Sequence, residues 1–217
     1  MDARELYEHR FDAADRAAKA RVWAVLCEDF FQRYVGPTDA VLDLGAGSCE
    51  FINHIHCGQK VAIDGDPNIS TRAAADVTSH CGAIDRLDWC GDGTFDVVFV
   101  SNVFEHLLDK ESLLRTLREV HRVLKPNGRL LILQPNIRYA YREYWDFLDH
   151  HLPLSDESML EALALTSFTV TEMRPRFLPY STKSALPQWP SLVRLYLRVP
   201  LAHRVLGKQM FVVARRQ

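Results

Sequence analysis

Two carboxylates and two glycines are spaced so that they could hold a ligand with positive charge and hydroxyl groups. Asp43, Gly45 and Gly47 lie at the end of an apolar run that starts at Val41. Glycine tolerates positive φ and lets a ligand approach the backbone. Asp64 ends a second apolar run about 20 residues beyond the turn, the distance at which a carboxylate can hydrogen-bond a ribose diol. The alternative for Asp64 is a cap on the next helix.

Two classes of ligand use a glycine turn of this kind. A dinucleotide-binding turn reads G-x-G-x-x-G, but Glu50 holds the third glycine position here, and its carboxylate would repel a pyrophosphate. S-adenosylmethionine (SAM), with its ammonium, sulfonium and ribose diol, suits these acidic surroundings better. Ser48 could cap the helix that follows, whose N-terminus favours a ligand carboxylate. An ordinary strand, turn and helix without a ligand is the alternative.

Three segments resemble class I SAM-dependent methyltransferases. The run Asp43-Leu44-Gly45-Ala46-Gly47-Ser48 closely resembles the first motif of that family. Phe-Asp-Val-Val from Phe95, followed by Glu-His-Leu at 105–107, resembles its fourth strand and the turn after it. Leu-Lys-Pro-Asn-Gly from Leu124 resembles its Leu-Lys-Pro-Gly-Gly turn. The resemblance covers 40–134 well and 155–217 only in outline.

The resemblance implies that SAM is the cofactor and gives each of its parts a place. The glycine turn would hold the methionine part, Asp64 the ribose, and residues 82–84 the adenine. Many members have Gly-Asp-Ala at this third place, with the aspartate bonded to adenine. That side chain is missing here, so backbone groups or Asp85 would serve instead. The residues implied for cofactor binding are Asp43, Gly45, Ala46, Gly47, Asp64, Gly65, Gly82, Ala83, Ile84, Ser101 and Asn102.

Two histidines are the candidate catalytic residues. In the register of the resemblance, the turn after the fourth strand lines the methyl-transfer centre, so His106 points toward cofactor or substrate. His150 follows the fifth strand in an aromatic, polar segment, 135–155, that we interpret as the substrate wall. Asp149 could orient His150 as a general-base pair, which only a hydroxyl acceptor would need. A surface helix with aromatic packing is the alternative for this segment.

We expect no metal ion. Neighbouring side chains diverge along a helix or strand, so one ion would not readily collect His150 and His151 together with Asp149. A second group lacks partners at a zinc-like spacing: His54, His56 and Cys57.

Strands that alternate with helices must position these residues. Apolar runs predict strands at 40–44, 60–64, 76–83, 95–100 and 129–134, and this alternation indicates a parallel sheet with right-handed crossovers. Two further β-rich runs lie at 168–173 and 209–214. The resemblance makes these strands six and seven of a Rossmann-like α/β fold. It has a mostly parallel seven-stranded sheet, helices on both faces, an antiparallel last strand and an N-terminal helical cap.

We expect a single domain over 1–217. It divides into a helical cap (1–36), a SAM-binding core (37–134) and a substrate wall with the last strands (135–217). In the cap, Tyr7 and Arg10 could reach the SAM carboxylate or the substrate, although a solvated amphipathic helix explains them equally well. A basic, apolar insertion lies at about 177–207. Its helix, 191–199, could lie on a membrane surface, grip a lipid-linked substrate through 191–206, form a dimer face, or close as a buried lid.

Composition narrows the partners. The 217 residues, 47% hydrophobic and 25% charged, are typical of a globular domain with a substantial core. The net charge of −2 is not broadly basic, which disfavours nucleic acid, and the Asn/Asp-Pro-Pro-Tyr/Phe motif of DNA methyltransferases is absent. The five cysteines show no C-x-x-C spacing, and no apolar run reaches the roughly 18 residues that cross a bilayer. We therefore expect a cytoplasmic protein.

These observations predict an enzyme that moves a methyl group from SAM to a small-molecule acceptor by in-line displacement. Candidate acceptors are a sugar, a lipid-linked intermediate or a secondary metabolite, attacking through a hydroxyl or another nucleophile. Two alternatives stay open. One is a catalytically silent, methyltransferase-like binding subunit, and the other is an NAD(P)-dependent oxidoreductase. The sequence leaves the oligomeric state open.

Overall fold

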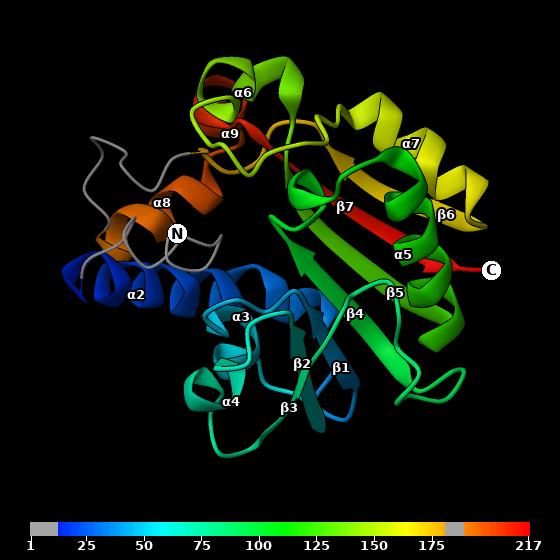
Figure 1. Ribbon diagram of the computed structural model, residues 1–217. Helices are drawn as coiled ribbons and strands as arrows, with labels where there is room; N and C mark the ends of the chain where they lie inside the picture. The colour runs from blue at the N-terminus through cyan, green and yellow to red at the C-terminus, as the bar shows by residue number, and fades with distance from the viewer. Residues whose placement is uncertain (1–12, 181–188) are drawn as a thin grey trace.

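A seven-stranded sheet in the order β3-β2-β1-β4-β5-β7-β6 organises the protein (Figure 1). The computed structural model describes residues 13–180 and 189–217. Neighbouring strands from β3 to β5 pair in parallel, and β7 runs antiparallel to both β5 and β6. The predicted Rossmann-like sheet with a reversed last strand is confirmed. The strands are β1 (Ala40–Leu44), β2 (Gln59–Asp64), β3 (Val77–Cys81), β4 (Phe95–Ser101), β5 (Leu124–Pro135), β6 (Phe168–Arg174) and β7 (Gln209–Arg216).

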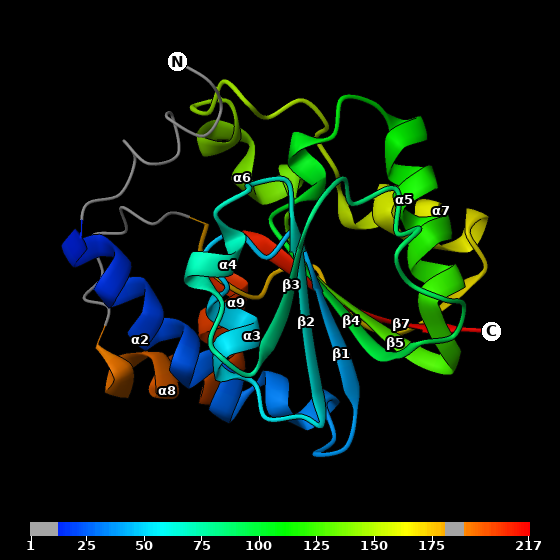
Figure 2. The same cartoon turned by 60° about the horizontal axis from the view of Figure 1, so that its bottom comes forward.

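Helices cover both faces of the sheet, as Figure 2 shows. On one face lie α5 (Lys110–Val123) and α7 (Asp156–Leu165), and on the other lie α2 (Ala13–Asp29), α3 (Glu50–His54) and α4 (Ile69–Arg72). The remaining helical elements are η1 (Phe31–Tyr34), η2 (Phe104–His106), α6 (Ile137–Tyr144), α8 (Pro190–Arg198) and α9 (Pro200–Leu206). No helix in the described parts of the chain is long and apolar enough to cross a bilayer.

The predicted N-terminal helix is present as α2, whereas Tyr7 and Arg10 lie outside the described residues. The division into cap, core and substrate wall stays a prediction. The basic insertion packs through α8 onto α2, because Arg194 donates hydrogen bonds to Glu28 and Asp29, each at 2.9 Å.

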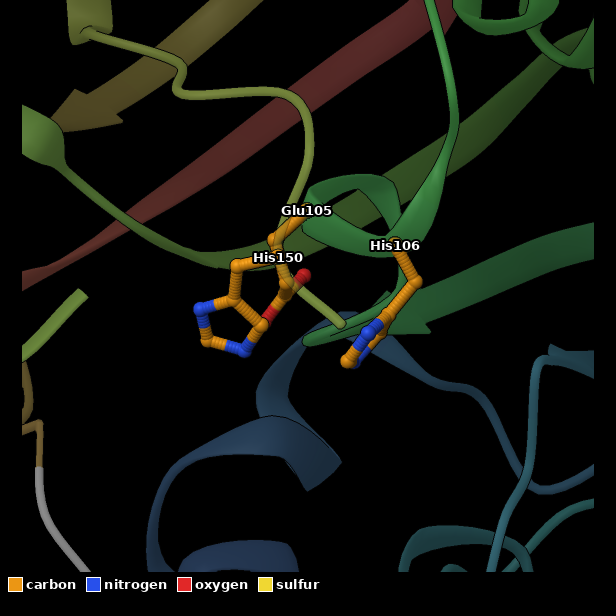
Figure 3. Close-up of side chains that lie close together, drawn as sticks. All are labelled: Glu105, His106 and His150. Carbon is orange, nitrogen blue, oxygen red and sulfur yellow. The ribbon is translucent and has the colours of Figure 1, made fainter. Parts of the chain in front are cut away.

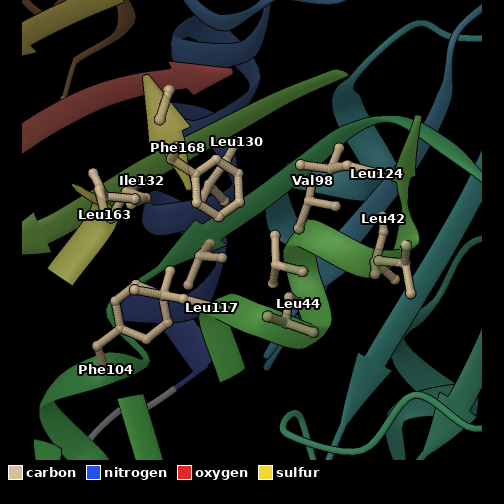
Figure 4. Close-up of a cluster of buried hydrophobic side chains, with 14 of the residues drawn as sticks. Leu42, Leu44, Val98, Phe104, Leu117, Leu124, Leu130, Ile132, Leu163 and Phe168 are labelled. Atoms are coloured by element: carbon tan, nitrogen blue, oxygen red, sulfur yellow. The ribbon is translucent and has the colours of Figure 1, made fainter. Parts of the chain in front are cut away.

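The two faces of the sheet bury different kinds of side chain. Alternate residues of a strand point to opposite faces. One face is mainly aliphatic, and Leu42, Leu130 and Leu163 lie in its cluster (Figure 4). The other face is rich in phenylalanine, and Phe51 and Phe99 stack with centroids 3.8 Å apart. Both faces of β1 and β4 are therefore covered.

One local prediction needs correction. We expected a fifth strand from Arg129, after a turn at 126–128. Instead β5 begins at Leu124, and the pairing with β4 shifts register between Phe95 and Val97 to take up the extra residues. Asn127 has φ +62° inside this irregularity, which fits its tolerance of the left-handed conformation.

Candidate active site

The glycine turn after β1 has the backbone conformation that its residues predicted. Gly45 has φ +74° and Gly47 has φ +53°. A Cβ on Gly45 would lie 2.4 Å from Cγ2 of Val103, whereas a Cβ on Gly47 would meet nothing within 4 Å. Gly45 is thus required for packing against the turn after β4. Gly47 borders open space, where a ligand can approach the backbone.

The helix after this turn begins differently from the prediction. Cys49 rather than Ser48 is the N-cap of α3, in the left-handed conformation at φ +61° and without a side-chain capping bond. A non-glycine residue rarely takes that conformation, and the sequence analysis missed it. Burial, followed by the charge of Asp43, raises the pKa of the Cys49 thiol to about 12, so the group is protonated at neutral pH.

Asp64 ties the end of β2 to the glycine turn. Its Oδ2 accepts a hydrogen bond from the Gly47 amide at 2.8 Å, and its Oδ1 accepts one from the Asp66 amide at 2.9 Å. The N-cap of α4 is Asn68, so Asp64 is not the helix cap that we considered. Each carboxylate oxygen has a second lone pair. Asp64 can therefore still accept hydrogen bonds from a diol.

Arg72 completes the frame of the turn, and the sequence analysis did not single it out. One guanidinium nitrogen donates to the carbonyl of Gly47 at 3.2 Å, and another pairs with Asp66 Oδ2 at 2.6 Å. An indication of this pair was present in the sequence, because Asp66 and Arg72 are only six residues apart. Their link became visible only with the short helix α4 in place.

Negative charge gathers beneath the glycine turn. Asp43 is only 3% exposed, and its pKa is raised well above its ordinary value by burial and by the charges of Glu50 and Asp64. Glu50 is paired with Lys19, with Nζ and Oε1 2.9 Å apart. A cationic ligand would relieve this repulsion, and a pyrophosphate would increase it.

The turn after β3 lies beside the end of β2. The Gly82 amide donates to the Asp64 carbonyl at 2.9 Å, and Ala83 is exposed. Asp85 pairs with Arg115 at 3.5 Å. The structure thus joins the segment proposed for adenine to the backbone of Asp64, the residue proposed for ribose.

The turn after β4 carries a buried polar atom without a partner. Asn102 has φ +52°, and its Nδ2 donates to Ser101 Oγ at 3.1 Å. Its Oδ1 is buried and accepts no hydrogen bond from the described residues. A buried acceptor without a donor is costly. A ligand N–H or O–H group would satisfy it.

Glu105, His106 and His150 come together beyond this turn (Figure 3). The two imidazole centroids are 5.1 Å apart, at an interplanar angle of 73°. His106 Nδ1 lies 3.0 Å from the Asp149 carbonyl and 3.3 Å from its carboxylate. His150 Nδ1 lies 2.9 Å from the Tyr144 carbonyl. The carboxylate expected to orient His150 is therefore seated against the other histidine.

Further polar groups surround these three residues, and the sequence analysis did not predict the contact from Gln134. Gln134 Nε2 donates to Glu105 Oε2 at 2.7 Å, and the pKa of this buried carboxylate is raised by its burial. The Glu105 carbonyl accepts the His151 amide at 2.7 Å, which fastens the His150 segment to η2. The Tyr144 hydroxyl is buried without a partner among the described residues, and burial raises its pKa.

Comparison with known proteins fits this geometry. Residues 42–132 match the family described as methyltransferase domain. This match covers somewhat less than half of the chain, so the chain is similar to that family over these residues. A SAM-dependent methyltransferase from Archaeoglobus fulgidus shares the fold, with a TM-score of 0.69 and 21% identity over 99% of this chain and 100% of that one.

Two curated relatives are more alike in sequence. An uncharacterised protein of Methanocaldococcus jannaschii is 32% identical over 117 residues, which are 53% of this chain and 50% of the relative. The probable methyltransferase ltbC of Aspergillus luteorubrus is 30% identical over 119 residues, 46% of this chain and 41% of the relative. The chain thus spans half or less of the length of these relatives.

The predicted cofactor residues lie where ligands bind open α/β sheets, at the carboxyl ends of the strands. They lie at the end of, or directly after, β1 (Asp43 to Gly47), β2 (Asp64 and Gly65), β3 (Gly82 to Ile84) and β4 (Ser101 and Asn102). The structure also brings the two candidate histidines together. Their individual contacts with SAM and acceptor stay predictions.

Proposed function

We propose that this protein transfers the methyl group of SAM to a small-molecule acceptor. The observation that carries the proposal is the contact between Gly45 and Val103. It sets the glycine turn after β1 directly against the turn that leads to Glu105 and His106, and we propose that the glycine turn binds SAM. Cofactor and acceptor would thus meet at the end of β4, with the methionine part over Gly47 and the ribose at Asp64.

Methyl transfer from SAM depends more on the alignment of the two reactants than on activation of the methyl group. The sulfonium is already a good leaving group, so the protein holds the nucleophile in line with the methyl carbon and excludes water. The acceptor's lone pair forms the bond to that carbon, and the carbon–sulfur bond breaks to give S-adenosylhomocysteine. A hydroxyl acceptor must also lose its proton.

The two histidines suit that proton transfer. A carbonyl oxygen can only accept a hydrogen bond, so the contacts of His106 and His150 place a proton on Nδ1 of each neutral ring. The lone pair is then on Nε2. His106 or His150 is therefore our candidate for the general base, by way of this nitrogen.

The insertion supports an acceptor that is delivered from a lipid surface. Apolar and basic side chains are exposed together on α8 and α9, and we propose that they rest on anionic lipid. They are Trp189, Leu195, Arg198, Val199, Leu201, Arg204, Val205 and Leu206. A cytoplasmic location is part of the proposal, supported by the five cysteines, which are all free.

Thermal unfolding with SAM, S-adenosylhomocysteine or NAD⁺ tests the proposal. A ligand at 100 times its dissociation constant adds about 2.7 kcal/mol to stability, or roughly 5–10 °C for a domain of this size. We expect that shift with SAM and S-adenosylhomocysteine only. A shift with NAD⁺ alone would identify an oxidoreductase. SAM binding without methyl transfer to any acceptor of a broad small-molecule panel would favour the silent binding subunit.

A further inference from the structure

The sequence analysis expected no metal ion, but it did not consider Glu105, His106 and His150 together. We infer that these residues form a binding site for one divalent transition-metal ion, which holds the oxygen of the methyl acceptor. The ligands would be one Glu105 carboxylate oxygen and Nε2 of each histidine. The existence of the site rests on the geometry of these side chains. Only its role rests on the proposed methyl transfer.

The three side chains are close enough to share an ion. One ligand atom from each lies within 4.8 Å of the others. An ion with bonds of about 2.0–2.2 Å in tetrahedral geometry separates its ligand atoms by roughly 3.3 Å. Each atom would therefore move inward by less than about 1 Å, which small side-chain rotations supply. In Figure 3 the two imidazoles flank the Glu105 carboxylate.

The surroundings orient these side chains as metal ligands are oriented. Metal-binding histidines almost always donate their other ring N–H group to a carbonyl or carboxylate, which fixes the tautomer. Both histidines do so here, His106 at the Asp149 carbonyl and His150 at the Tyr144 carbonyl. The carboxylate of Glu105 is itself held by Gln134 at 2.7 Å. A hydrogen bond to another residue therefore orients each of the three proposed ligands.

The ligand types select the ion. Two imidazoles and one carboxylate suit Zn²⁺, Fe²⁺, Co²⁺ or Mn²⁺, whereas Mg²⁺ and Ca²⁺ prefer oxygen ligands throughout. Glu105 and His150 are buried, but the side chain of His106 is 40% exposed. The site is therefore open on one side, and an acceptor oxygen or water can take a further coordination position.

The ion would take the place of the histidine general base considered above, since Nε2 of both histidines would then bind the ion. An acceptor hydroxyl bound to it loses its proton to solvent more readily, because the cation stabilises the alkoxide. The oxygen lone pair then attacks the methyl carbon of SAM, and the carbon–sulfur bond breaks. The products are the methyl ether, S-adenosylhomocysteine and one proton. Acceptors with a hydroxyl, above all those with a second neighbouring oxygen, fit this arrangement.

Titration of the tag-free protein with Co²⁺ tests the site, because bound Co²⁺ is visible by its d–d absorption. We expect one equivalent to bind, with the spectrum of a nitrogen- and oxygen-ligated ion, and Zn²⁺ to displace it. Glu105→Gln and His106→Ala should each weaken binding tenfold or more. His151→Ala is the matched control, since His151 is the exposed neighbour of His150 and should leave the affinity unchanged.

Circular dichroism and SAM titration on each variant show that it is folded. The inference is overturned if the wild-type protein binds no Co²⁺, or if Glu105→Gln and His106→Ala bind it as tightly as the wild type. A protein that binds Co²⁺ at these residues but does not bind SAM would refute the proposed function and leave the metal site standing.

Discussion

The two sides of the site are built in different ways. The side that we propose binds SAM, here called the SAM side, spans residues 40–84. It consists of consecutive strand ends and turns, whose key contacts join residues such as Gly47 and Asp64. The acceptor side joins η2 to a loop after α6, so Glu105 and His150 meet only in the folded chain. Both sides contain a buried carboxylate. On the SAM side Asp43 lies close to the charges of Glu50 and Asp64, whereas on the acceptor side Glu105 accepts a hydrogen bond from Gln134.

This difference shows that a proposed cofactor site can be built from residues close together in the sequence, while the polar group beside it joins residues far apart in the sequence. The contact between Gly45 and Val103 joins the two sides. If the sides are separate units, a change on one should leave the other intact, and a change at the contact should damage both.

The largest effect is expected at that contact. Gly45→Ala forces a side chain into a left-handed position, at roughly 1–2 kcal/mol, and overpacks Val103, at roughly 1–3 kcal/mol more. It should lower the unfolding midpoint and abolish SAM binding. Gly47→Ala is the matched control, because it carries the conformational cost without the clash.

A double variant sharpens this result. Gly45→Ala combined with Val103→Ala should recover more stability than the single changes predict when added together. Equal destabilisation by Gly45→Ala and Gly47→Ala would contradict the importance of the contact.

Asp43→Asn should weaken SAM binding and stabilise the ligand-free protein. Removal of the buried charge loses a charge-assisted contact of roughly 1.5–3 kcal/mol, about ten- to a hundredfold in affinity. The same change removes the repulsion from Glu50 and Asp64. Calorimetry with SAM and thermal unfolding without it measure the two effects.

The stability gain of Asp43→Asn should depend on pH. The folded state raises the pKa of Asp43 above the ordinary 3.8, so the folded state binds this proton more tightly than the unfolded state. The resulting stability is present below pH 3.8 and is lost as pH rises through the folded-state pKa. The advantage of Asp43→Asn should therefore be largest at neutral pH and disappear in acid. A pH-independent difference would exclude this origin.

Gln134→Leu should loosen the acceptor side alone. The change leaves the buried Glu105 carboxylate without its 2.7 Å donor and destabilises the fold by about 1–3 kcal/mol. Urea unfolding measures the loss, and SAM titration should give the wild-type affinity. A parallel fall in SAM affinity would show that the two sides are coupled.

The smallest effect is expected on the insertion. Sedimentation with anionic vesicles should capture the wild-type protein at low salt. The single change Arg198→Gln should weaken that capture severalfold, since each basic residue near such a surface contributes about 1 kcal/mol. Thermal stability and SAM affinity should not change. Wild-type protein that stays in solution would remove the lipid-surface proposal.

The sequence predicted more of the SAM side than of the acceptor side. Asp43, Gly45 and Asp64 could be found because strand ends and glycine turns have local signatures, and the parallel sheet then brings them to one edge. Glu105 and Gln134 could not, since an acidic residue in a turn and a polar residue in a strand carry no sign of their partner. Cys49 was missed because its left-handed conformation follows from tertiary packing.

SAM binding at Asp64 is the most direct test of the central claim. Calorimetry with S-adenosylhomocysteine and its 2′-deoxy analogue, on the wild type and Asp64→Ala, isolates the ribose contact in a thermodynamic cycle. We predict one site per chain, and a loss of roughly tenfold for the analogue in the wild type that disappears in Asp64→Ala. Equal affinities for both ligands in the wild type, or no binding at all, would contradict the assignment of this turn to SAM.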